Sequence, residues 1–275
     1  MLRKNILVIV SNNNNSEEFN NWVKEIFHLE NLDIFIFDEN LNKLDSRLTI
    51  ADYIINFLSD DDKYEYVQEK IELLKIDFFG NNLVNVKLFS KKNNFKKIIQ
   101  QSKFQTPVFE KINNRNALEL FNNFSQPSRI FSKENNYFSN QISSLKDIED
   151  VFVKVGNISD YTIEEFIDGI EIYVFTFVID NQRIIFAVKN NNGVFEKIEM
   201  KLNEKIKKDV RELMEYGKIE EFALFNLIYS EKRGLYFLNI FLKNNMLFKY
   251  KNILDNILSI HKYRGLKEIF KKDLF

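Results

Sequence analysis

The chain has 275 residues, 45% of them hydrophobic and 29% charged, which is the composition of a globular protein with one or two domains. It has no cysteine and two histidines, His28 and His261, so disulfides, thiolate nucleophiles and multi-histidine metal sites are excluded. The formal net charge of −1 provides no field that would draw the chain to nucleic acid or to an anionic membrane. We therefore expect a cytoplasmic protein that binds neither.

The first third of the chain predicts strands that alternate with helices. Ser16 is a typical N-cap residue, followed by two glutamates and by apolar residues at helical spacing. The apolar run 6–10 is typical of a buried parallel strand and is too short for a signal-peptide core. Together these patterns favour an open α/β layer. Strands are expected at 6–10, 34–37 and 53–58, and helices over 16–27 and 64–74.

The remainder of the chain predicts antiparallel α+β structure. A helical stretch with Phe95, Ile98 and Ile99 on one face and Lys96 and Lys97 beside them is stopped by Pro107. Short β-rich runs separated by turns follow, and a lysine-rich amphipathic tail ends the chain. Strands are expected at 129–131, 137–142, 161–165, 171–180, 183–189, 222–229 and 235–242, and helices over 145–153 and 202–216.

Glycine spacing limits the kinds of nucleotide site. The seven glycines never fall within two residues of one another, so the sequence contains neither a Rossmann G-x-G-x-x-G motif nor a Walker A loop. Any catalysis would have to use carboxylates, lysines or hydroxyls.

Four segments carry a resemblance to a known family. Residues 161–171, Y-T-I-E-E-F-I-D-G-I-E, are similar to a strand, hinge and turn pattern I-E-E-F-I-x-G-x-E. Residues 67–81 resemble a helix that leads into the next domain, and 193–201 resemble G-x-F-Y-D-Y-E-A-K. Residues 224–246 are similar to R-x-D-F followed by x-E-x-N-T-x-P-G-M. In this order the segments resemble the ATP-grasp superfamily, and within it D-alanine–D-alanine ligase and its relatives.

The resemblance implies an architecture and a reaction. The fold would be ATP-grasp, α/β plus α+β: an N-terminal open α/β domain (1–88), a central small α+β lobe (89–166) and a C-terminal antiparallel-sheet lobe (167–275). In such enzymes a carboxylate attacks the γ-phosphate of ATP, and an amine captures the acyl phosphate. Lysines neutralise the phosphates, and acidic or amide groups hold Mg²⁺.

The resemblance also implies roles for particular residues. Lys97, Lys133 and Lys201 would face phosphates, Glu164, Glu165, Phe166 and Ile167 would face adenine, Glu171 would face ribose, and Glu18 would contact a substrate amino group. Simpler interpretations stand beside these. The lysines can be solvated surface residues in a lysine-rich chain, Glu171 can pair with a neighbouring lysine, and Glu18 can be an acid that stabilises a helix N-terminus.

The sequence departs from the family at the metal and transition-state positions. Asn226 and Asn239 stand where two metal-binding carboxylates are expected, Phe241 replaces an asparagine, and Leu224 replaces an arginine. Neutral amides cancel none of the charge of Mg²⁺, so we expect ATP as a ligand but no metal site. The phosphate lid is reduced to 134–137, without glycine, and the histidine-bearing segment is replaced by 57–63.

Three functions remain open. The first is a degenerate ATP-grasp protein that keeps a nucleotide- or small-ligand-binding cleft. The second is an active ATP-dependent carboxylate–amine ligase with substitute metal ligands such as Glu196, Glu199 or Glu221. The third is an interaction module that uses aromatic surface, since the chain has 28 phenylalanines. A homodimer or a protein partner also stays open.

Overall fold

The structure is a computed structural model. It describes residues 5–12, 16–27, 33–37, 41–89, 91–112, 116–124, 127–132, 137–155, 161–179, 182–219 and 221–260. No helix among these residues is long and apolar enough to cross a membrane.

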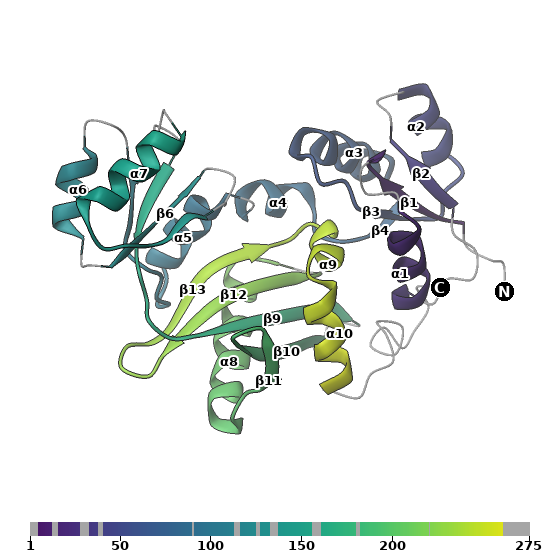
Figure 1. Cartoon of the computed structure of the whole chain (residues 1–275). Helices are drawn as coiled ribbons and strands as arrows, with labels where there is room; N and C mark the ends of the chain where they lie inside the picture. The colour runs from purple at the N-terminus through teal and green to yellow at the C-terminus, as the bar shows by residue number, and fades with distance from the viewer. Residues whose placement is uncertain are drawn as a thin grey trace. The chain divides into compact units, whose positions relative to one another are not determined.

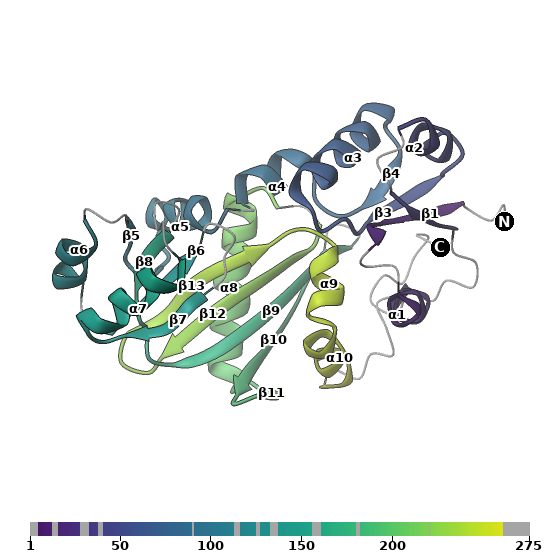
Figure 2. The same cartoon turned by 45° about the horizontal axis from the view of Figure 1, so that its top comes forward.

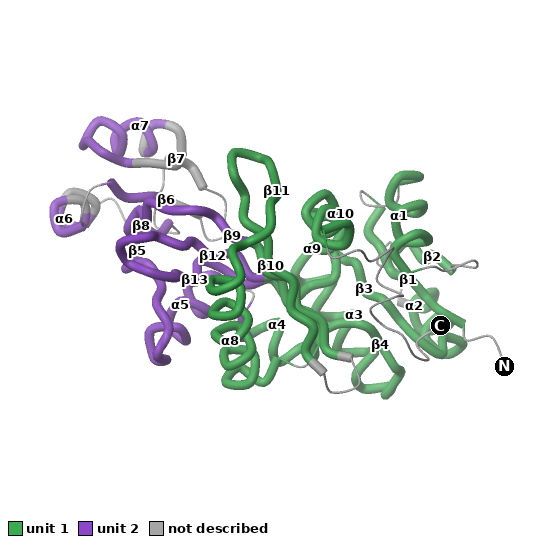
Figure 3. Tube along the Cα trace, turned by 90° about the horizontal axis from the view of Figure 1, so that it is seen from below, with its two compact units in different colours: residues 1–87, 173–224, 241–275 green, residues 88–172, 225–240 purple. Residues whose placement is uncertain are grey.

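The chain folds into two compact units (Figure 3). Unit 1 contains residues 1–87, 173–224 and 241–275, and unit 2 contains residues 88–172 and 225–240. Unit 1 thus combines most of the first and third expected domains, while unit 2 holds the expected central lobe together with strand residues 225–240. The three-domain division itself stays a prediction.

The N-terminal part of unit 1 is a parallel sheet with the strand order β2-β1-β3-β4 (Figure 1). All five residues of β1 are buried, as the continuous apolar run predicts. The Ser16 hydroxyl accepts a hydrogen bond from the Phe19 N–H at 3.1 Å, which confirms the predicted N-cap of α1. The elements are β1 (Ile6–Val10), α1 (Glu17–Phe27), β2 (Asp33–Ile36), α2 (Leu41–Leu48), β3 (Tyr53–Asn56), α3 (Asp61–Leu74), β4 (Asp77–Phe79) and α4 (Leu83–Phe89).

The rest of unit 1 is built on long strands with helices on both faces. Helix α8 and helix α10 cover opposite sides of strand β10 (Figures 2 and 3). Phenylalanines 175, 177 and 222 join the side chains of β1, α1 and β3 in one apolar core, so unit 1 has a single interior. The elements are β9 (Ile170–Ile179), β10 (Gln182–Asn191), β11 (Val194–Lys197), α8 (Met200–Tyr216), α9 (Asn245–Lys249) and α10 (Lys251–Ile260). Strands β12 (Ala223–Ser230) and β13 (Gly234–Phe241) lie mostly in unit 2, which contains residues 225–240.

Two buried asparagines tie the parts of unit 1 together. The Asn244 amide donates to the backbone carbonyls of Asn56 at 3.2 Å and Phe79 at 2.6 Å. The Asn81 amide donates to the carbonyls of Phe222 and Leu242. Because these carbonyls lie at the ends of strands, each amide supplies donors that the sheets cannot provide there. The link therefore rests on hydrogen bonds as well as on apolar packing.

Unit 2 contains an antiparallel sheet with the order β5-β8-β6-β7. Its core contains Ile130, Ile142, Ile148 and Ile163, with α6 and α7 packed beside the sheet (Figure 1). The expected antiparallel α+β character of this region is confirmed. The elements are α5 (Lys92–Gln100), β5 (Phe109–Ile112), α6 (Ala117–Asn123), β6 (Ser128–Ser132), β7 (Tyr137–Ile142), α7 (Leu145–Val155) and β8 (Tyr161–Glu165).

The aromatic side chains are used mainly inside the fold. Among the described residues, the exposed large apolar side chains are aliphatic with one exception, Tyr216. Phenylalanines instead fill the cores and contact one another, as Phe19 does with Phe57 at 5.2 Å between ring centroids. This distribution gives no support to an aromatic interaction surface.

Candidate functional site

A buried cluster of ions lies at the end of strand β8 in unit 2. The Lys92 Nζ is 3.2 Å from Oε1 of Glu164, and the Lys96 Nζ contacts its Oε2. None of the three side chains is more than 2% exposed. Strand pairing sets Glu164 opposite Phe109 on one side and opposite Arg129 on the other. One carboxylate is therefore contacted by two lysines in the interior of the unit, with the half-buried Arg129 opposite it on the neighbouring strand.

Burial and the neighbouring charges shift the pKa values of this cluster. Burial disfavours the charged ammonium and lowers the pKa of Lys92 to about 7, although Glu164 opposes this shift. Burial also lowers the pKa of Lys96. Burial alone would raise the pKa of Glu164, but Lys96 and Lys92 hold it at about 2. The carboxylate is therefore ionised at neutral pH, and Lys92 exchanges its proton close to neutrality.

The hinge segment that follows Glu164 is held largely by its own backbone. The Glu165 N–H donates to the carbonyl of Val108 at 2.9 Å, and the Phe166 N–H donates to that of Pro127 at 3.1 Å. Within the described residues, the Ile167 N–H donates to no backbone carbonyl.

Side chains around the hinge are paired or packed. The Glu165 carboxylate accepts from Nη1 of Arg233 at 2.6 Å, and the guanidinium of Arg129 stacks on the ring of Phe166 at 4.4 Å. The side chain of Ile167 instead packs into an apolar cluster from the paired strands β12 and β13. The cluster consists of Ile167, Ile228, Tyr236 and Leu238.

Gly169, which follows the hinge, is required because the backbone of a neighbouring strand leaves no room for a side chain. A Cβ atom at Gly169 would lie 2.4 Å from the backbone oxygen of Tyr229 and 2.8 Å from a methyl group of Ile228. Real Cβ contacts of this kind do not occur, so the backbone would have to move. This explains why the turn between β8 and β9 has glycine two residues before Glu171.

We expect Gly169→Ala to lower the free energy of unfolding of unit 2 by about 1–3 kcal/mol, because the added methyl overpacks a backbone contact. Urea unfolding followed by circular dichroism measures the change. The neighbouring exposed residue provides a control, since Asp168→Ala adds nothing to the contact. Equal stability of the two variants would contradict the close approach.

Glu171 and Asn226 form a pair on the neighbouring strands β9 and β12. The Asn226 Nδ2 donates to Oε1 of Glu171 at 2.8 Å, and both side chains are half-buried. Asn239 is buried, and its Oδ1 accepts from the N–H of Ile240. Among the described residues, no group of three histidine or acidic side chains could hold a metal ion. The amides at 226 and 239 are thus engaged within the protein.

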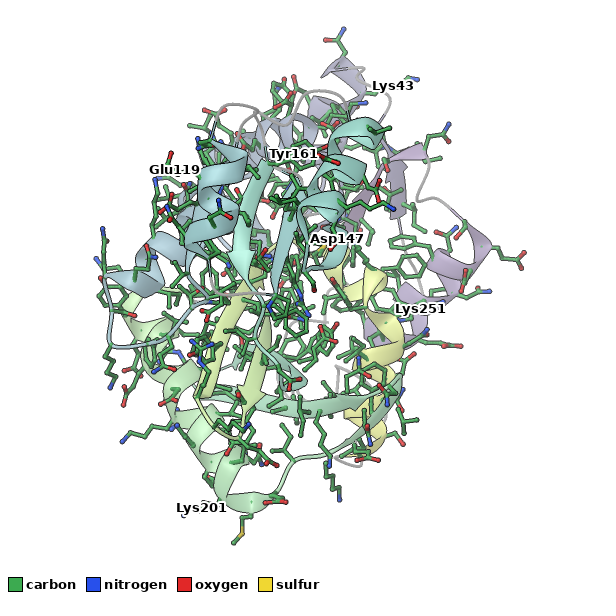
Figure 4. The ribbon with its side chains drawn as sticks, turned by 60° about the vertical axis from the view of Figure 1, so that its left-hand side comes forward. Lys43, Glu119, Asp147, Tyr161, Lys201 and Lys251 are labelled. Carbon is green, nitrogen blue, oxygen red and sulfur yellow. The ribbon has the colours of Figure 1, made fainter. Side chains whose placement is uncertain are left out.

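Three of the other expected site residues are described. Lys97 is exposed on α5, next to the buried Lys96. Lys201 lies in the first turn of α8 in unit 1 and is exposed (Figure 4). Glu18 pairs with Lys251, also in unit 1. Lys133 and the expected lid, 134–137, lie outside the described residues apart from the backbone of Tyr137.

Two further family positions lie in the apolar interior of unit 1. Leu224, at the arginine position, is fully buried in its core. Phe241, at the asparagine position, packs against the same core, with its ring centroid 5.6 Å from that of Tyr250. The substitute metal ligands proposed from the sequence are not gathered either: Glu196 pairs with Lys189 at 3.0 Å, and Glu199 is exposed.

Sequence reasoning missed the two lysines that contact Glu164. The signal was present, because Lys92, Phe95, Lys96 and Ile99 share one face of a helix at positions i, i+3, i+4 and i+7. Two lysines on a face that also carries buried apolar side chains indicate a buried acidic partner. Arg233 was missed as well, since a turn residue gives no comparable pattern.

Comparisons with known proteins were made for both sequence and structure. No family model and no curated protein matches the sequence. The structure is similar to D-alanine–D-alanine ligase from Bacillus anthracis complexed with ATP, with 16% identity and a TM-score of 0.76 over 95% of this chain and 93% of that chain. It is also similar to L-amino acid ligase from Bacillus licheniformis, with 16% identity and a TM-score of 0.64 over 91% and 70% of the two chains. A third similar structure is an ADP complex of N5-carboxyaminoimidazole ribonucleotide synthetase, with 10% identity and a TM-score of 0.69 over 89% of this chain and 72% of that chain. At these identities the likeness is one of fold.

Proposed function

Since the chain has the ATP-grasp fold, we propose that it is a degenerate relative of the carboxylate–amine ligases that binds an adenine nucleotide in unit 2 and has weak or no ligase activity. The observation that carries the proposal is the buried cluster of Lys92, Lys96 and Glu164 next to the hinge. Burying two ammonium groups against one carboxylate is costly, and an anionic ligand would offset that cost. Phosphate groups have the required charge.

The hinge supports the nucleoside half of the proposed ligand. The Ile167 N–H would donate to the base, and the base would lie against the apolar cluster of Ile228, Tyr236 and Leu238. Glu171, on the strand that follows, would accept from ribose hydroxyls. The phosphates would then extend toward Lys92 and Lys96. Lys97 and Lys201 are exposed, and phosphate roles for them rest on resemblance alone.

Two features support the loss of ligase activity. Leu224 and Phe241 pack in an apolar core, so neither can steady a developing negative charge. The amides of Asn226 and Asn239 are engaged within the protein, and neutral amides leave the charge of a divalent ion uncompensated. Losing both an arginine and a metal from phosphoryl transfer typically removes several orders of magnitude in rate.

Isothermal titration with ATP and with ADP tests the binding proposal directly. We expect saturable binding of both nucleotides, and we expect Lys92→Met to weaken it at least tenfold. Lys97→Met is the matched control, because that lysine lies on the same helix but is exposed. Absence of binding, or equal effects of the two variants, would refute a phosphate site at the buried lysines.

A turnover assay tests the loss of ligase activity. The purified chain is incubated with ATP, Mg²⁺ and mixtures of amino acids, and released ADP and phosphate are measured. We expect no amino-acid-dependent release above background. Robust release would show instead an active ligase.

A further inference from the structure

The hydrogen bond between Asn226 and Glu171 has consequences for what the site can bind. Its donor is the side-chain amide nitrogen of Asn226, which lies 2.8 Å from a carboxylate oxygen of Glu171. The two residues lie on the neighbouring strands β12 and β9, so the strand backbones fix their separation. Both side chains are half-buried, where such a bond is shielded from water.

A divalent cation does not fit this arrangement. A cation needs an oxygen to face it, whereas Asn226 turns its nitrogen toward Glu171. The side-chain oxygen of Asn239 already accepts from a backbone N–H. Within the described part of the chain, no group of acidic or histidine side chains could supply the missing ligands. The amide donor therefore orients the carboxylate by a hydrogen bond and leaves its charge in place.

Resting on the proposed function, we propose that Asn226 is a positioning residue that orients Glu171 toward the ribose of the nucleotide and makes binding independent of divalent metal. An ionised carboxylate has about four acceptor sites, so it can accept from ligand hydroxyls as well as from the amide of Asn226. A fixed carboxylate at this place selects a ligand with ribose hydroxyls over one that lacks them. The site thus recognises the nucleoside without a bridging ion.

Asn226→Asp reverses the sign of the interaction while keeping the shape of the side chain. Two carboxylates would then lie about as close as the amide and the carboxylate do now, where they repel each other unless a cation bridges them. The ligand for the test is AMP, which binds Mg²⁺ only weakly by itself, and its 2′,3′-dideoxy analogue reports on ribose recognition. Both are titrated in EDTA and in Mg²⁺.

The wild-type chain should bind AMP equally, within twofold, in EDTA and in Mg²⁺, and should prefer it at least tenfold to the dideoxy analogue. In EDTA, Asn226→Asp should lose at least tenfold in AMP affinity together with the ribose preference. Mg²⁺ should restore both. Asn190→Asp is the matched control: an aspartate there can still accept from the Gly193 N–H, so neither readout should change.

Other outcomes separate this inference from the proposed function. A folded wild-type chain that binds no AMP overturns both. A chain that binds AMP only with Mg²⁺, or an Asn226→Asp variant that behaves like wild type in EDTA, overturns the metal-independent role of Asn226 alone. If Asn226→Asp fails to fold, Asn226→Ala decides: ribose preference should disappear and should not return with Mg²⁺, and its retention overturns the inference.

Discussion

Replacing Glu164 by glutamine should lower the free energy of unfolding of unit 2 by about 3–5 kcal/mol, because it leaves two buried ammonium groups without their carboxylate. The amide keeps the size of the side chain, so lost packing contributes little. Repulsion between Lys92 and Lys96 then adds to the cost of burial, and Arg129 adds to it further.

The measurement must report on unit 2. The single tryptophan, Trp22, lies in unit 1, so fluorescence follows that unit, while hydrogen exchange of the β8 amides follows unit 2. Glu110→Gln provides a matched control on the neighbouring strand β5, where the side chain is exposed. A Glu164→Gln variant within 1 kcal/mol of this control would show that the cluster is not buried as described.

A compensating change sharpens the test. Adding Lys92→Met to Glu164→Gln removes one of the two ammonium groups that have lost the carboxylate. It puts an apolar side chain of similar length in its place. We expect Lys92→Met to raise the stability more in the Glu164→Gln chain than in the wild type, where it also removes the contact of Lys92 with Glu164, so the two changes should not be additive. An equal effect of Lys92→Met in both chains would mean that the two residues do not act on each other.

The sequence carried enough information to predict the fold. The strand at 6–10 and the helix that begins after Ser16 follow from local patterns, and the structure confirms both. Their assembly into an ATP-grasp fold rests on resemblance, and the structural likeness confirms it. Two short strands, β4 and β5, were not predicted from the sequence. Strands β4 and β5 are three and four residues long, too short for a period of two to stand out.

The candidate site could be predicted only in part. The motif placed Glu164, Ile167 and Glu171 on one strand, hinge and turn, because that information is contiguous in sequence. The partners of Glu164 come from a helix about 70 residues earlier, and helix register decides which lysine reaches it. Burial, which no motif records, distinguishes Lys96 from the exposed Lys97.

The pairing of Asn226 with Glu171 was also beyond the sequence. Comparison with the family motif shows which charge is missing at 226, but not what the replacing amide does. That depends on which strands are neighbours, and β9 pairs with β12 across some 50 residues of chain. The sequence therefore indicated the loss of a negative charge at position 226, whereas the structure shows the hydrogen bond that Asn226 makes with Glu171.

The stability of the chain should depend on pH because the buried Lys92 binds its proton less tightly in the folded chain than in the unfolded chain. The pKa of Lys92 is lowered by burial from its ordinary value of 10.5 to about 7. Between these two values the unfolded chain binds a proton that the folded chain does not, so stability rises with pH from about 7 to 10. Each tenfold change in proton affinity corresponds to about 1.4 kcal/mol, so the rise should amount to several kcal/mol.

Other groups define the limits of this window. Burial raises the pKa of both Tyr53 and Tyr64, so above pH 10 the unfolded chain releases protons first and stability falls. On the acid side, Glu164 has its pKa lowered from 4.5 to about 2, and its contribution is lost as the pH falls through that range. A maximum near pH 10 is therefore expected, together with a separate loss in acid.

Lys92→Met measures how much of the alkaline rise comes from Lys92. The variant should be more stable than wild type at pH 7, because Lys96 and Glu164 then form a matched pair, and the slope between pH 7 and 10 should become smaller. Burial also lowers the pKa of Lys96, so part of the slope should stay. Lys97→Met, on the exposed face of the same helix, should keep the slope. Urea unfolding at closely spaced pH values measures both. If the slope in Lys92→Met equals that of the wild type, Lys92 does not titrate in this range, and burial does not lower its pKa as described.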